Sequence, residues 1–313
     1  MRIIKKTTTF DFLSVTRRRI ALLISALFVI ASFVSLATRG LEFGIDFTGG
    51  ILLEVGYPQA ANLDEIRSNL GVAGFSDAQV QRFGRDTDVL VRLPPQPGTE
   101  ADEVRTQLQQ ILQAGGESVE LRRVEFVSAQ VGSELAERGA LALVIALLMI
   151  FMYVMIRFQW KFSAGAVAAL AHDAIVTVGF FSVFGLPFDL TVVAAVLAVI
   201  GYSLNDTVVA FDRIRENFFA LRGVSSEESM NTSINEMLAR TLITGLTTLL
   251  VLVALLVLGG ESIAPFSIAL IVGIIVGTYS SIYTASATAL ALNVNAQDLI
   301  EPVKDPSLID DLP

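Results

Sequence analysis

One carboxylate stands inside an apolar stretch of this chain, and it is the residue best placed to do chemistry. Asp206 lies within IGYSLNDTVVAFDRIREN, residues 200–217, which runs from apolar to charged. Moving an ionised Asp to the centre of a bilayer costs about 2.5–3.5 kcal/mol even on the scale derived from insertion experiments. Asp206 therefore needs an ion-pair partner, a path for water, or a proton of its own.

Arg240 starts the next apolar segment and is expected at a similar depth. With a rise of about 1.5 Å per residue, Asp206 lies about 24 Å from the outer end of its helix, in the inner third of a membrane. Arg240 can extend inward along Thr244, Thr247 and Thr248, which share its helix face. An ion pair would relieve the cost of burying either charge, and protonation of Asp206 would break it. Alternatively, Arg240 extends to lipid phosphates and Asp206 only bonds to neighbouring hydroxyls.

A second candidate pair is His172 and Asp173, in another apolar segment and about 14 Å from its inner end. His172 is the only histidine of the chain. A histidine beside an acid can relay protons, or it can stay neutral and form a hydrogen bond to a facing helix. Successive helical residues point about 100° apart, so the two side chains need not touch.

Two further groups have mainly structural interpretations. The last apolar segment carries Gly273 and Gly277 at a spacing typical of close helix packing. Hydroxyls recur along the same segment at Thr278, Ser281, Thr284 and Thr288. Asp212, Arg213, Arg215 and Glu216 form a charged cluster at the end of the Asp206 segment, either solvated or able to dock a cytoplasmic partner.

The elements that must position these residues are membrane-spanning helices. Of 313 residues, 53% are apolar and 17% are charged, and the mean hydropathy is +0.64, values typical of integral membrane proteins. Six segments can cross a hydrocarbon core of about 30 Å. They are residues 20–37, 139–156, 163–185, 190–211, 241–258 and 265–291.

The distribution of basic residues predicts the orientation. Lys and Arg cluster before the first segment, between the second and third, and after the fourth, whereas the loops 185–189 and 259–265 contain none. The positive-inside bias then places both termini in the cytoplasm. The first segment could instead be a cleaved signal peptide, but its apolar run exceeds the usual core of about 7–15 residues.

Residues 39–138 form the one polar block of domain size. The sequence predicts strands at 51–57, 78–84, 89–93 and 118–127, helices at 61–70 and 100–112, and a turn at 85–88. This order is that of a ferredoxin-like α+β domain. Residues 40–138 hold 16 acids against 8 arginines, which argues against nucleic-acid binding by this domain.

The resulting fold class is a polytopic α-helical membrane protein with a ferredoxin-like domain between its first two helices. The expected layout is a cytoplasmic N-terminus at 1–19, helix 1 at 20–38, helices 2–6 within 139–292, and an acidic cytoplasmic tail at 293–313. Residues 225–240 are expected to form an amphipathic helix on the cytoplasmic face, with Ser225 and Glu228 as a capping box.

Composition and motifs also exclude several chemistries. The chain has no cysteine and one histidine, which removes thiol chemistry and most zinc sites. It has no Walker motif, dinucleotide fingerprint or nucleophile elbow, so an ion gradient is the candidate source of energy. In GIDFTGG (44–50), the glycines Gly44, Gly49 and Gly50 favour turns, and Asp46 can bond to the local backbone.

Several motifs together resemble the SecF family, accessory subunits of the bacterial Sec translocase that belong with SecD to the resistance-nodulation-division superfamily. They are GIDFTGG (44–50), VSAQVGSELAERG (127–139), AHD (171–173), IGYSLNDTVVAFDRIREN (200–217) and RTLIT (240–244). The likeness covers essentially the whole chain, with the motifs in the family's order.

The resemblance implies SecD as a pseudo-symmetric partner, association with the SecYEG channel and YajC, and use of the proton motive force to move preproteins. It implies an inner-membrane protein among lipids, with residues 39–138 in the periplasm, no bound cofactor and protons as the coupling ion. By motif, Asp206 and Arg240 match the family's proton-coupling pair, and His172 and Asp173 match its span-three motif. Other motif residues are Gly44, Asp46, Gly49, Gly50, Asn205, Asp212 and Arg213.

Two other functions share parts of this pattern. One is half of a proton antiporter for drugs or lipids, which the single small outer domain argues against. The other is a scaffold in which the charges inside the membrane serve only assembly.

Overall fold

The computed structural model describes residues 8–94, 106–108, 110–112, 119–221, 223–260, 263–295 and 298. Within these residues, six helices are long and apolar enough to cross a membrane, which confirms the predicted number. They are α1 (Val15–Thr38), α5 (Ala129–Arg157), α6 (Trp160–Phe184), α7 (Leu190–Ala220), α8 (Ser226–Leu258), and a last helix formed by α9 (Ala264–Ser280), η2 (Ser281–Ala285) and α10 (Ser286–Ala291).

Several helices extend beyond the predicted apolar segments. Helix α5 begins at Ala129 instead of residue 139, because the Ser128 hydroxyl caps its first turn by accepting from the Val131 amide. The predicted surface helix at 225–240 is wrong as a separate element, since α8 runs unbroken from Ser226 to Leu258. No Gly or Pro interrupts residues 226–244, so nothing ends the helix before the apolar part.

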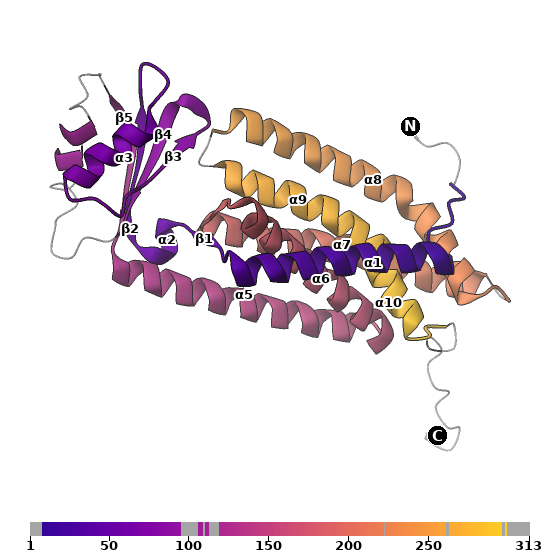
Figure 1. Ribbon diagram of the computed structural model, residues 1–313. Coiled ribbons are helices and arrows are strands. Elements are labelled where there is room, and N and C mark those ends of the chain that lie inside the picture. The colour runs from indigo at the N-terminus through magenta and orange to yellow at the C-terminus, as the bar shows by residue number, and fades with distance from the viewer. Residues whose placement is uncertain are drawn as a thin grey trace, which may run out of the picture.

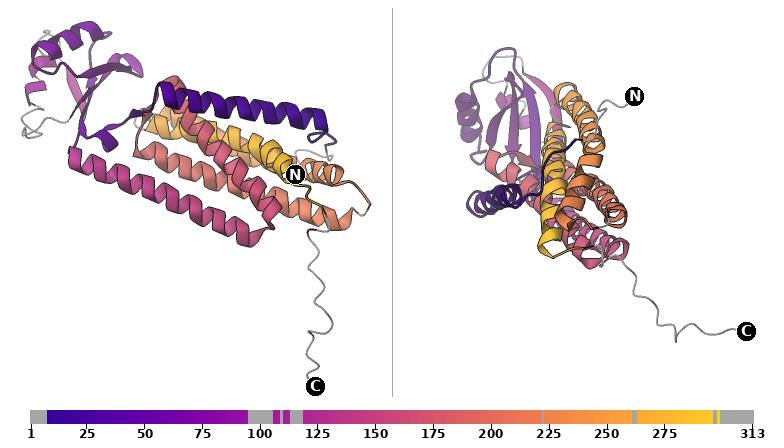
Figure 2. Two further views of the ribbon diagram at one scale, coloured as in Figure 1. Left: turned by 60° about the horizontal axis from the view of Figure 1, so that its bottom comes forward. Right: turned by 90° about the vertical axis from the view of Figure 1, so that its right-hand side faces the viewer.

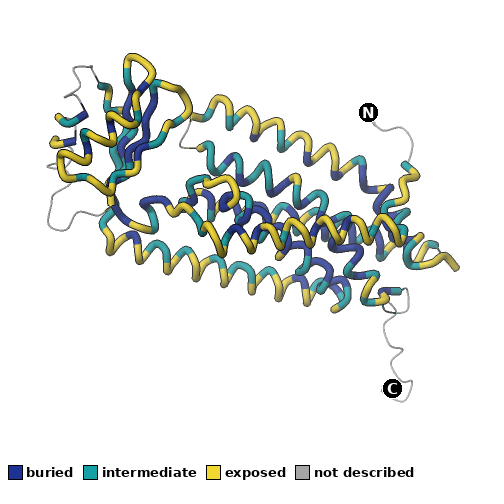
Figure 3. Tube along the Cα trace, viewed as in Figure 1, coloured by how far each residue is buried: buried dark blue, intermediate teal, exposed yellow. Residues whose placement is uncertain are grey.

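Helices α6, α7 and α9 form the centre of the bundle. In the most apolar 18-residue stretch of each helix, 50% of the residues are buried in α6, 44% in the last helix and 39% in α7, against 6% in α5. Figure 3 shows the same contrast, with exposed residues concentrated along α5 and α8. Many polar residues of the central helices, among them Asp173, Ser203 and Ser280, therefore face protein, whereas α5 and α8 present apolar surface outward.

Helices α7 and α9 run side by side in a constant register, with contacts that recur every turn. A Cβ added at Gly273 would lie 2.1 Å from a Val199 methyl, and one at Gly277 would lie 3.1 Å from the Ser203 Cβ. One turn further on, the Thr207 and Ser281 hydroxyls are 2.9 Å apart. The predicted close packing at the two glycines is thereby confirmed.

The polar block forms an antiparallel sheet with one helix well described. Its strands are β2 (Gly50–Gly56), β3 (Gln79–Phe83), β4 (Arg85–Leu93) and β5 (Glu120–Val127), in the order β3-β4-β2-β5, and α3 (Leu63–Val72) follows β2. This is the sheet order of the predicted ferredoxin-like domain. Of the predicted helix at 100–112, residues 106–108 and 110–112 are helical, and the others lie outside the described residues.

The predicted turn at 85–88 is wrong, because these residues belong to β4. The chain reverses at Gly84 instead, where φ is +74° and Phe83 pairs directly with Arg85. Glycine adopts a positive φ without strain, so Gly84 can form the reversal. Polar side chains at residues 85–88 are compatible with a strand end as well as with a turn. Asp88 is nevertheless 2% exposed, and it pairs with Arg122 of β5 at 2.9 Å.

The sheet domain projects from one end of the helix bundle (Figures 1 and 2). The start of α1 and the end of α10 lie at the opposite end (Figure 1). Two short strands, β1 (Glu42–Phe43) and β6 (Pro187–Phe188), pair in parallel where the domain meets the bundle. Most of the predicted acidic tail, and residues 1–7 of the N-terminus, lie outside the described residues.

Candidate functional site

Asp206 lies on α7 where that helix meets α8. Its side chain is half-buried, and Oδ1 accepts a hydrogen bond from the Thr241 hydroxyl of α8 at 3.2 Å. Thr241 is 2% exposed, so water does not compete for this bond from the α8 side. Thr241 therefore fixes the position of the Asp206 carboxylate.

The predicted ion pair between Asp206 and Arg240 is not formed in this structure. Among the described residues, no arginine or lysine forms an ion pair with Asp206, and Arg240 is exposed. Successive residues of a helix point about 100° apart, so Thr241 contacts the carboxylate directly, whereas Arg240 acts on it only through its charge at longer range. The depth estimate found the right level of α8 but could not give its rotation.

A small cavity adjoins the Asp206 carboxylate. About 10 Å³ of it is open to the centre of a water molecule, close to the minimum of about 10–15 Å³ needed to hold one water. Its lining includes Asp206, Thr241 and Ser281, among apolar side chains. The cavity can thus hold a single water molecule in contact with the Asp206 side chain.

Asp173 forms a second polar centre, at the contact of α6, α7 and α9. Its side chain is fully buried, and Oδ2 lies 2.5 Å from the Ser203 hydroxyl and 2.7 Å from the Ser280 hydroxyl. Its Oδ1 lies 3.0 Å from Nδ1 of His172, so the two neighbours do touch. Nε2 of His172 is buried without a hydrogen-bond partner, and the ring lies 6.3 Å from that of Tyr279.

The last spanning helix widens into a π-helical turn next to this centre. The turn η2 begins at Ser281, directly after Ser280, and Ser281 bonds to Thr207 of α7. A Cβ at Gly165 of α6 would lie 2.5 Å from the Ala285 carbonyl, so α6 closes on the turn. Single π-helical turns occur often at functional sites, which fits the position of η2 between the two carboxylates.

The predicted charge cluster at the inner end of α7 is engaged in ion pairs within the chain. Asp212 pairs with Arg157 of α5 at 2.6 Å. Arg213 pairs with Glu216 of its own helix and with Glu236 of α8, both at 2.6 Å. These pairs join the inner ends of three helices. A structural role thereby explains the cluster.

The GIDFTGG motif joins the sheet domain to the bundle, and the predicted local role of Asp46 is wrong. Asp46, in the short helix α2 (Ile45–Thr48), accepts from the Leu190 amide at 3.0 Å and so helps to cap α7. Gly49 has φ +69°, and a Cβ there would lie 2.7 Å from Ala129 Cα at the start of α5. A Cβ at Gly50 would lie 2.2 Å from the Leu93 carbonyl. The motif thus meets α5, α7 and the sheet at once.

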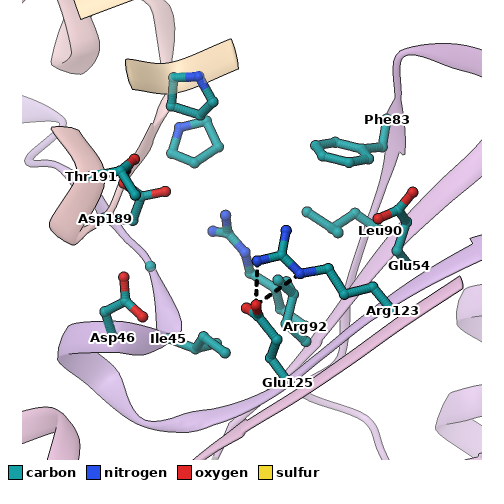
Figure 4. A pocket seen from close by; sticks show the side chains of 14 residues that line it. Ile45, Asp46, Glu54, Phe83, Leu90, Arg92, Arg123, Glu125, Asp189 and Thr191 are labelled. Atoms are coloured by element: carbon teal, nitrogen blue, oxygen red, sulfur yellow. Dashed lines mark hydrogen bonds and ion pairs between the residues drawn. The ribbon is translucent and has the colours of Figure 1, made fainter. Parts of the chain in front are cut away.

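A cleft of about 230 Å³ separates the open face of the sheet from the outer ends of α2 and α7. Figure 4 shows Arg92 and Arg123 reaching into it from the sheet, with Asp46 and Asp189 opposite. Arg123 pairs with Glu125, whereas Nε of Arg92 is buried without a hydrogen-bond partner. Burial lowers the pKa of the Arg92 guanidinium, and the charges of Glu42 and Asp189 act in the opposite direction.

The sequence did not single out the hydroxyl partners of the two carboxylates. Ser203, Thr241 and Ser280 are buried hydroxyls in mainly apolar stretches of helix, and such residues are common as packing contacts. The available signal was spacing: Ser203 and Thr207 lie one turn apart, like Gly277 and Ser281, which predicts a shared polar face once α7 and α9 are paired.

The fold and the site define a polytopic membrane protein with carboxylates held between its spanning helices. Residues 107–295 match the family "Protein export membrane protein SecD/SecF, C-terminal", and residues 34–61 match the "SecD/SecF GG Motif". The chain belongs to the SecD/SecF family, among the SecF subunits of protein translocases.

Curated relatives match along their whole length. The protein translocase subunit SecF of Vibrio alginolyticus is 47% identical over 99% of both chains, and that of Pseudomonas aeruginosa is 47% identical over 98% of this chain and 99% of its own. A crystal structure of SecDF from Thermus thermophilus, described as translocon-associated, matches 91% of this chain with a TM-score of 0.83 at 35% identity. SecDF in a super-membrane-facing form matches 94% with a TM-score of 0.66 at 36% identity. The chain spans 39% and 40% of these two SecDF chains.

Proposed function

We propose that this chain works with SecD to couple the proton motive force to preprotein movement through the SecYEG channel, across the bacterial inner membrane. The observation that carries the proposal is the Asp206 carboxylate, held by one hydroxyl beside a cavity of water size and left without a fixed cation in the described structure. Acids inside spanning helices mark proton and ion pathways. No covalent chemistry and no bound cofactor are part of this proposal.

In this mechanism, the charge of Asp206 sets the packing of α7 against α8. The ionised carboxylate holds Thr241 and attracts Arg240, whereas a protonated Asp206 loses its attraction for that cation. One charge crossing 100 mV is worth about 2.3 kcal/mol, enough to bias two arrangements that differ by such an amount. Helices α7 and α8 would then rearrange and transmit the motion to the sheet domain.

The connection between bundle and sheet domain supports the transmission step. Asp46 bonds to the first residue of α7, and Gly49 lies against the start of α5, so movement of either helix reaches the sheet domain directly. At nearly equal sequence identity, the two SecDF structures match this chain with TM-scores of 0.83 and 0.66. The lower TM-score belongs to the structure described as a super-membrane-facing form.

The exposed faces of α7 and α8 support a partner chain inside the membrane. Asn205 and Arg240 are exposed on helices that can span a membrane, and lipid tails would not satisfy their polar groups. We assign the covering of these groups to SecD. Contacts with SecYEG, YajC, the preprotein and lipid complete the proposed set of partners.

The layout of the chain supports the proposed orientation. The sheet domain lies at one end of the bundle, and the start of α1 and the end of α10 lie at the other (Figure 1). The start of α1 and the ends of α5 and α7, which carry arginines, also lie away from the sheet domain. The positive-inside bias then places both termini in the cytoplasm and the sheet domain in the periplasm.

The test is preprotein import into inverted inner-membrane vesicles that contain SecYEG and SecD, with and without a proton gradient. This chain is compared with Asp206→Asn and with Glu137→Gln, which neutralises an exposed acid of α5. Gradient-dependent stimulation in the wild type and in Glu137→Gln, but not in Asp206→Asn, is expected at equal assembly with SecD. Equal stimulation by all three would contradict the proposal and leave Asp206 a packing residue.

A further inference from the structure

The carboxylate of Asp173 is buried without a fixed cation. It is 0% exposed, and among the described residues no arginine or lysine forms an ion pair with it. Its partners are the hydroxyls of Ser203 and Ser280 and the ring of His172. A carboxylate in such a place is either stabilised by hydrogen bonds alone or carries a proton.

The hydroxyl of Ser280 can serve both charge states of Asp173. It has one proton to donate and two acceptors within reach, Asp173 Oδ2 at 2.7 Å and the Gly277 carbonyl at 3.1 Å. When Asp173 is ionised, Ser280 donates to Oδ2. When Oδ2 carries a proton, Asp173 donates to Ser280, which turns its own proton to Gly277. Either state is satisfied without movement of a helix.

His172 serves best as a neutral ring that orients Asp173. His172 is 6% exposed, and its Nδ1 faces Asp173 Oδ1. Its Nε2 is buried and has no hydrogen-bond partner among the described residues. A second ring proton on Nε2 would be a buried donor without an acceptor, at a cost of about 1–3 kcal/mol or more for a charged group. The exchangeable proton of this centre therefore belongs to Asp173.

Two pairs of hydroxyls, one helical turn apart, lie between Asp173 and the cavity at Asp206. Ser203 binds Asp173, and Thr207 lies one turn further along α7, where it bonds to Ser281 at 2.9 Å. Ser281 lines the same cavity as Asp206. Ser280 and Ser281 are consecutive on the last helix, and the π-helical turn begins between them.

We propose that Asp173 is a second proton-carrying carboxylate, which exchanges its proton with Asp206 through the hydroxyls of Ser203, Thr207, Ser280 and Ser281. The inference rests on the proposed coupling role of Asp206. In each transfer Asp173 loses one proton and Asp206 gains it, and every hydroxyl or water between them receives one proton and passes one on. The hydroxyl residues relay the proton, and no bond other than those to hydrogen changes.

Few other titratable groups face this path. Among the described residues, the middle parts of the helices packed on α6 carry Tyr153, Tyr202, Tyr279 and Tyr283 besides the two acids and His172. Tyr279 lies beside His172, but its hydroxyl donates to the Ala21 carbonyl of α1 at 2.6 Å. Arg240 of α8 also acts on Asp206 through its charge. A tyrosine hydroxyl is neutral and an arginine is charged at ordinary pH, so the two carboxylates are the groups that change charge.

The chain supplies matched controls for the hydroxyls of the path. Ser267 lies on α9 and Thr177 on α6, both fully buried, and neither hydroxyl has a hydrogen-bond partner among the described residues. Ser267→Ala and Thr177→Val therefore remove a buried hydroxyl from the same bundle without touching the path. Ser281→Ala and Thr207→Val are the corresponding path variants, and Ser281→Thr keeps the hydroxyl.

The experiment measures gradient-dependent import in vesicles that contain SecD and SecYEG, together with co-purification of each variant with SecD. We expect Ser281→Ala, Thr207→Val and Asp173→Asn to lower the gradient-dependent rate by about 10-fold or more, since positioned proton-transfer groups contribute about 10²–10⁴-fold. Import without a gradient and co-purification should not change. Ser281→Thr, Ser267→Ala and Thr177→Val should behave like the wild type.

Three results would overturn the inference, and each has a distinct meaning. If Ser281→Ala and Asp173→Asn keep full gradient stimulation while Asp206→Asn abolishes it, the coupling role of Asp206 stands and the path through Asp173 is wrong. If Ser281→Ala and Ser267→Ala lower import equally, the loss reflects packing of the last helix. If Asp206→Asn keeps gradient-dependent stimulation of import, both the proposed path and the proposed function are wrong.

Discussion

Asp206 and Asp173 are both acids within spanning helices, but their surroundings differ. Asp206 is half-buried, with one hydroxyl donor and a cavity of water size, whereas Asp173 is fully buried with partners on three helices. Water therefore reaches the Asp206 carboxylate more easily than the Asp173 carboxylate. The structure thus suits Asp206 for exchange with a water path and Asp173 for exchange through hydroxyls.

Thr241 is the residue that we expect to matter most among the neighbours of Asp206. Thr241→Val removes the donor to Oδ1 with little change of volume, and a hydrogen bond to a charged group is worth about 1.5–3 kcal/mol. The gradient-dependent import rate should fall by about 10-fold, because 1.4 kcal/mol corresponds to a factor of ten. Thr244→Val is the control, since that hydroxyl bonds to its own helix backbone. An equal effect of both substitutions would contradict this role.

The sequence predicted Asp206 as a site residue but not its direct partner. An acid in an apolar run stands out because its burial is costly, and this signal needs no knowledge of neighbouring helices. The choice between Arg240 and Thr241 depends on the rotation of α8, which is set by packing against α7. Asp46 was misjudged for a similar reason, because its partner Leu190 is distant in sequence.

At the scale of elements, the parallel contact of α7 with α9 positions both carboxylates. Small residues let the two helices approach every turn, at Gly273 against Val199 and at Gly277 against Ser203. This contact places Ser280 and Ser281 beside α7. The glycine spacing predicted close packing, whereas the identity of the facing helix came only from the structure.

Gly273→Ala should weaken this contact. The new Cβ would lie 2.1 Å from a Val199 methyl, and overpacking of this kind costs about 1–3 kcal/mol of unfolding free energy. We expect a lower thermal unfolding temperature in detergent, and partial recovery when Val199→Ala is combined with it. Gly201→Ala is the control, because nothing lies within 4 Å of its added Cβ. A loss of stability in Gly201→Ala as large as that in Gly273→Ala would contradict this account.

The elements of the sheet domain were largely predictable, with one instructive failure. Alternating apolar residues predicted the strands, and the Asn62 side chain caps α3 by accepting from the Asp64 amide. The polar residues 85–88 resembled a turn, yet they extend β4 because the reversal needs the positive φ of Gly84. Glycine was the better indicator than polarity in this hairpin.

At the scale of the whole molecule, the segment before α1 ties the first and fifth spanning helices together. The Asn235 side chain of α8 accepts from the Phe10 amide at 2.8 Å and donates to the Phe10 carbonyl at 2.6 Å. Asn231, one turn earlier, accepts from the Phe12 amide at 2.7 Å. The helix that carries Thr241 is thus held at its inner end by residues far away in sequence.

Asn235→Ala should release this segment. It removes both hydrogen bonds to Phe10, each worth about 0.5–1.5 kcal/mol, from a side chain that is 6% exposed. We expect faster protease cleavage before Val15 and a thermal unfolding temperature lowered by a few degrees. Thr232→Ala, which loses only a bond to its own helix, should leave cleavage unchanged. Equal cleavage of both variants and the wild type would show that Asn235 does not hold the segment.

The overall layout followed from the sequence, but the joint between sheet domain and bundle did not. Hydropathy and loop charges predict the spans and their direction. The cleft lined by Arg92, Asp46 and Asp189 depends instead on how the two parts meet, through β1, β6 and α2. No local pattern encodes that meeting, because its contacts join residues far apart along the chain.

The most direct test of the central claim, that Asp206 carries the coupling proton, is proton flux into liposomes that contain this chain with SecD. A pH-sensitive dye inside the liposomes reports acidification when a membrane potential, negative inside, is imposed. We predict acidification with the wild type and with Glu137→Gln, and only the leak of empty liposomes with Asp206→Asn. Wild-type acidification by Asp206→Asn would contradict the account.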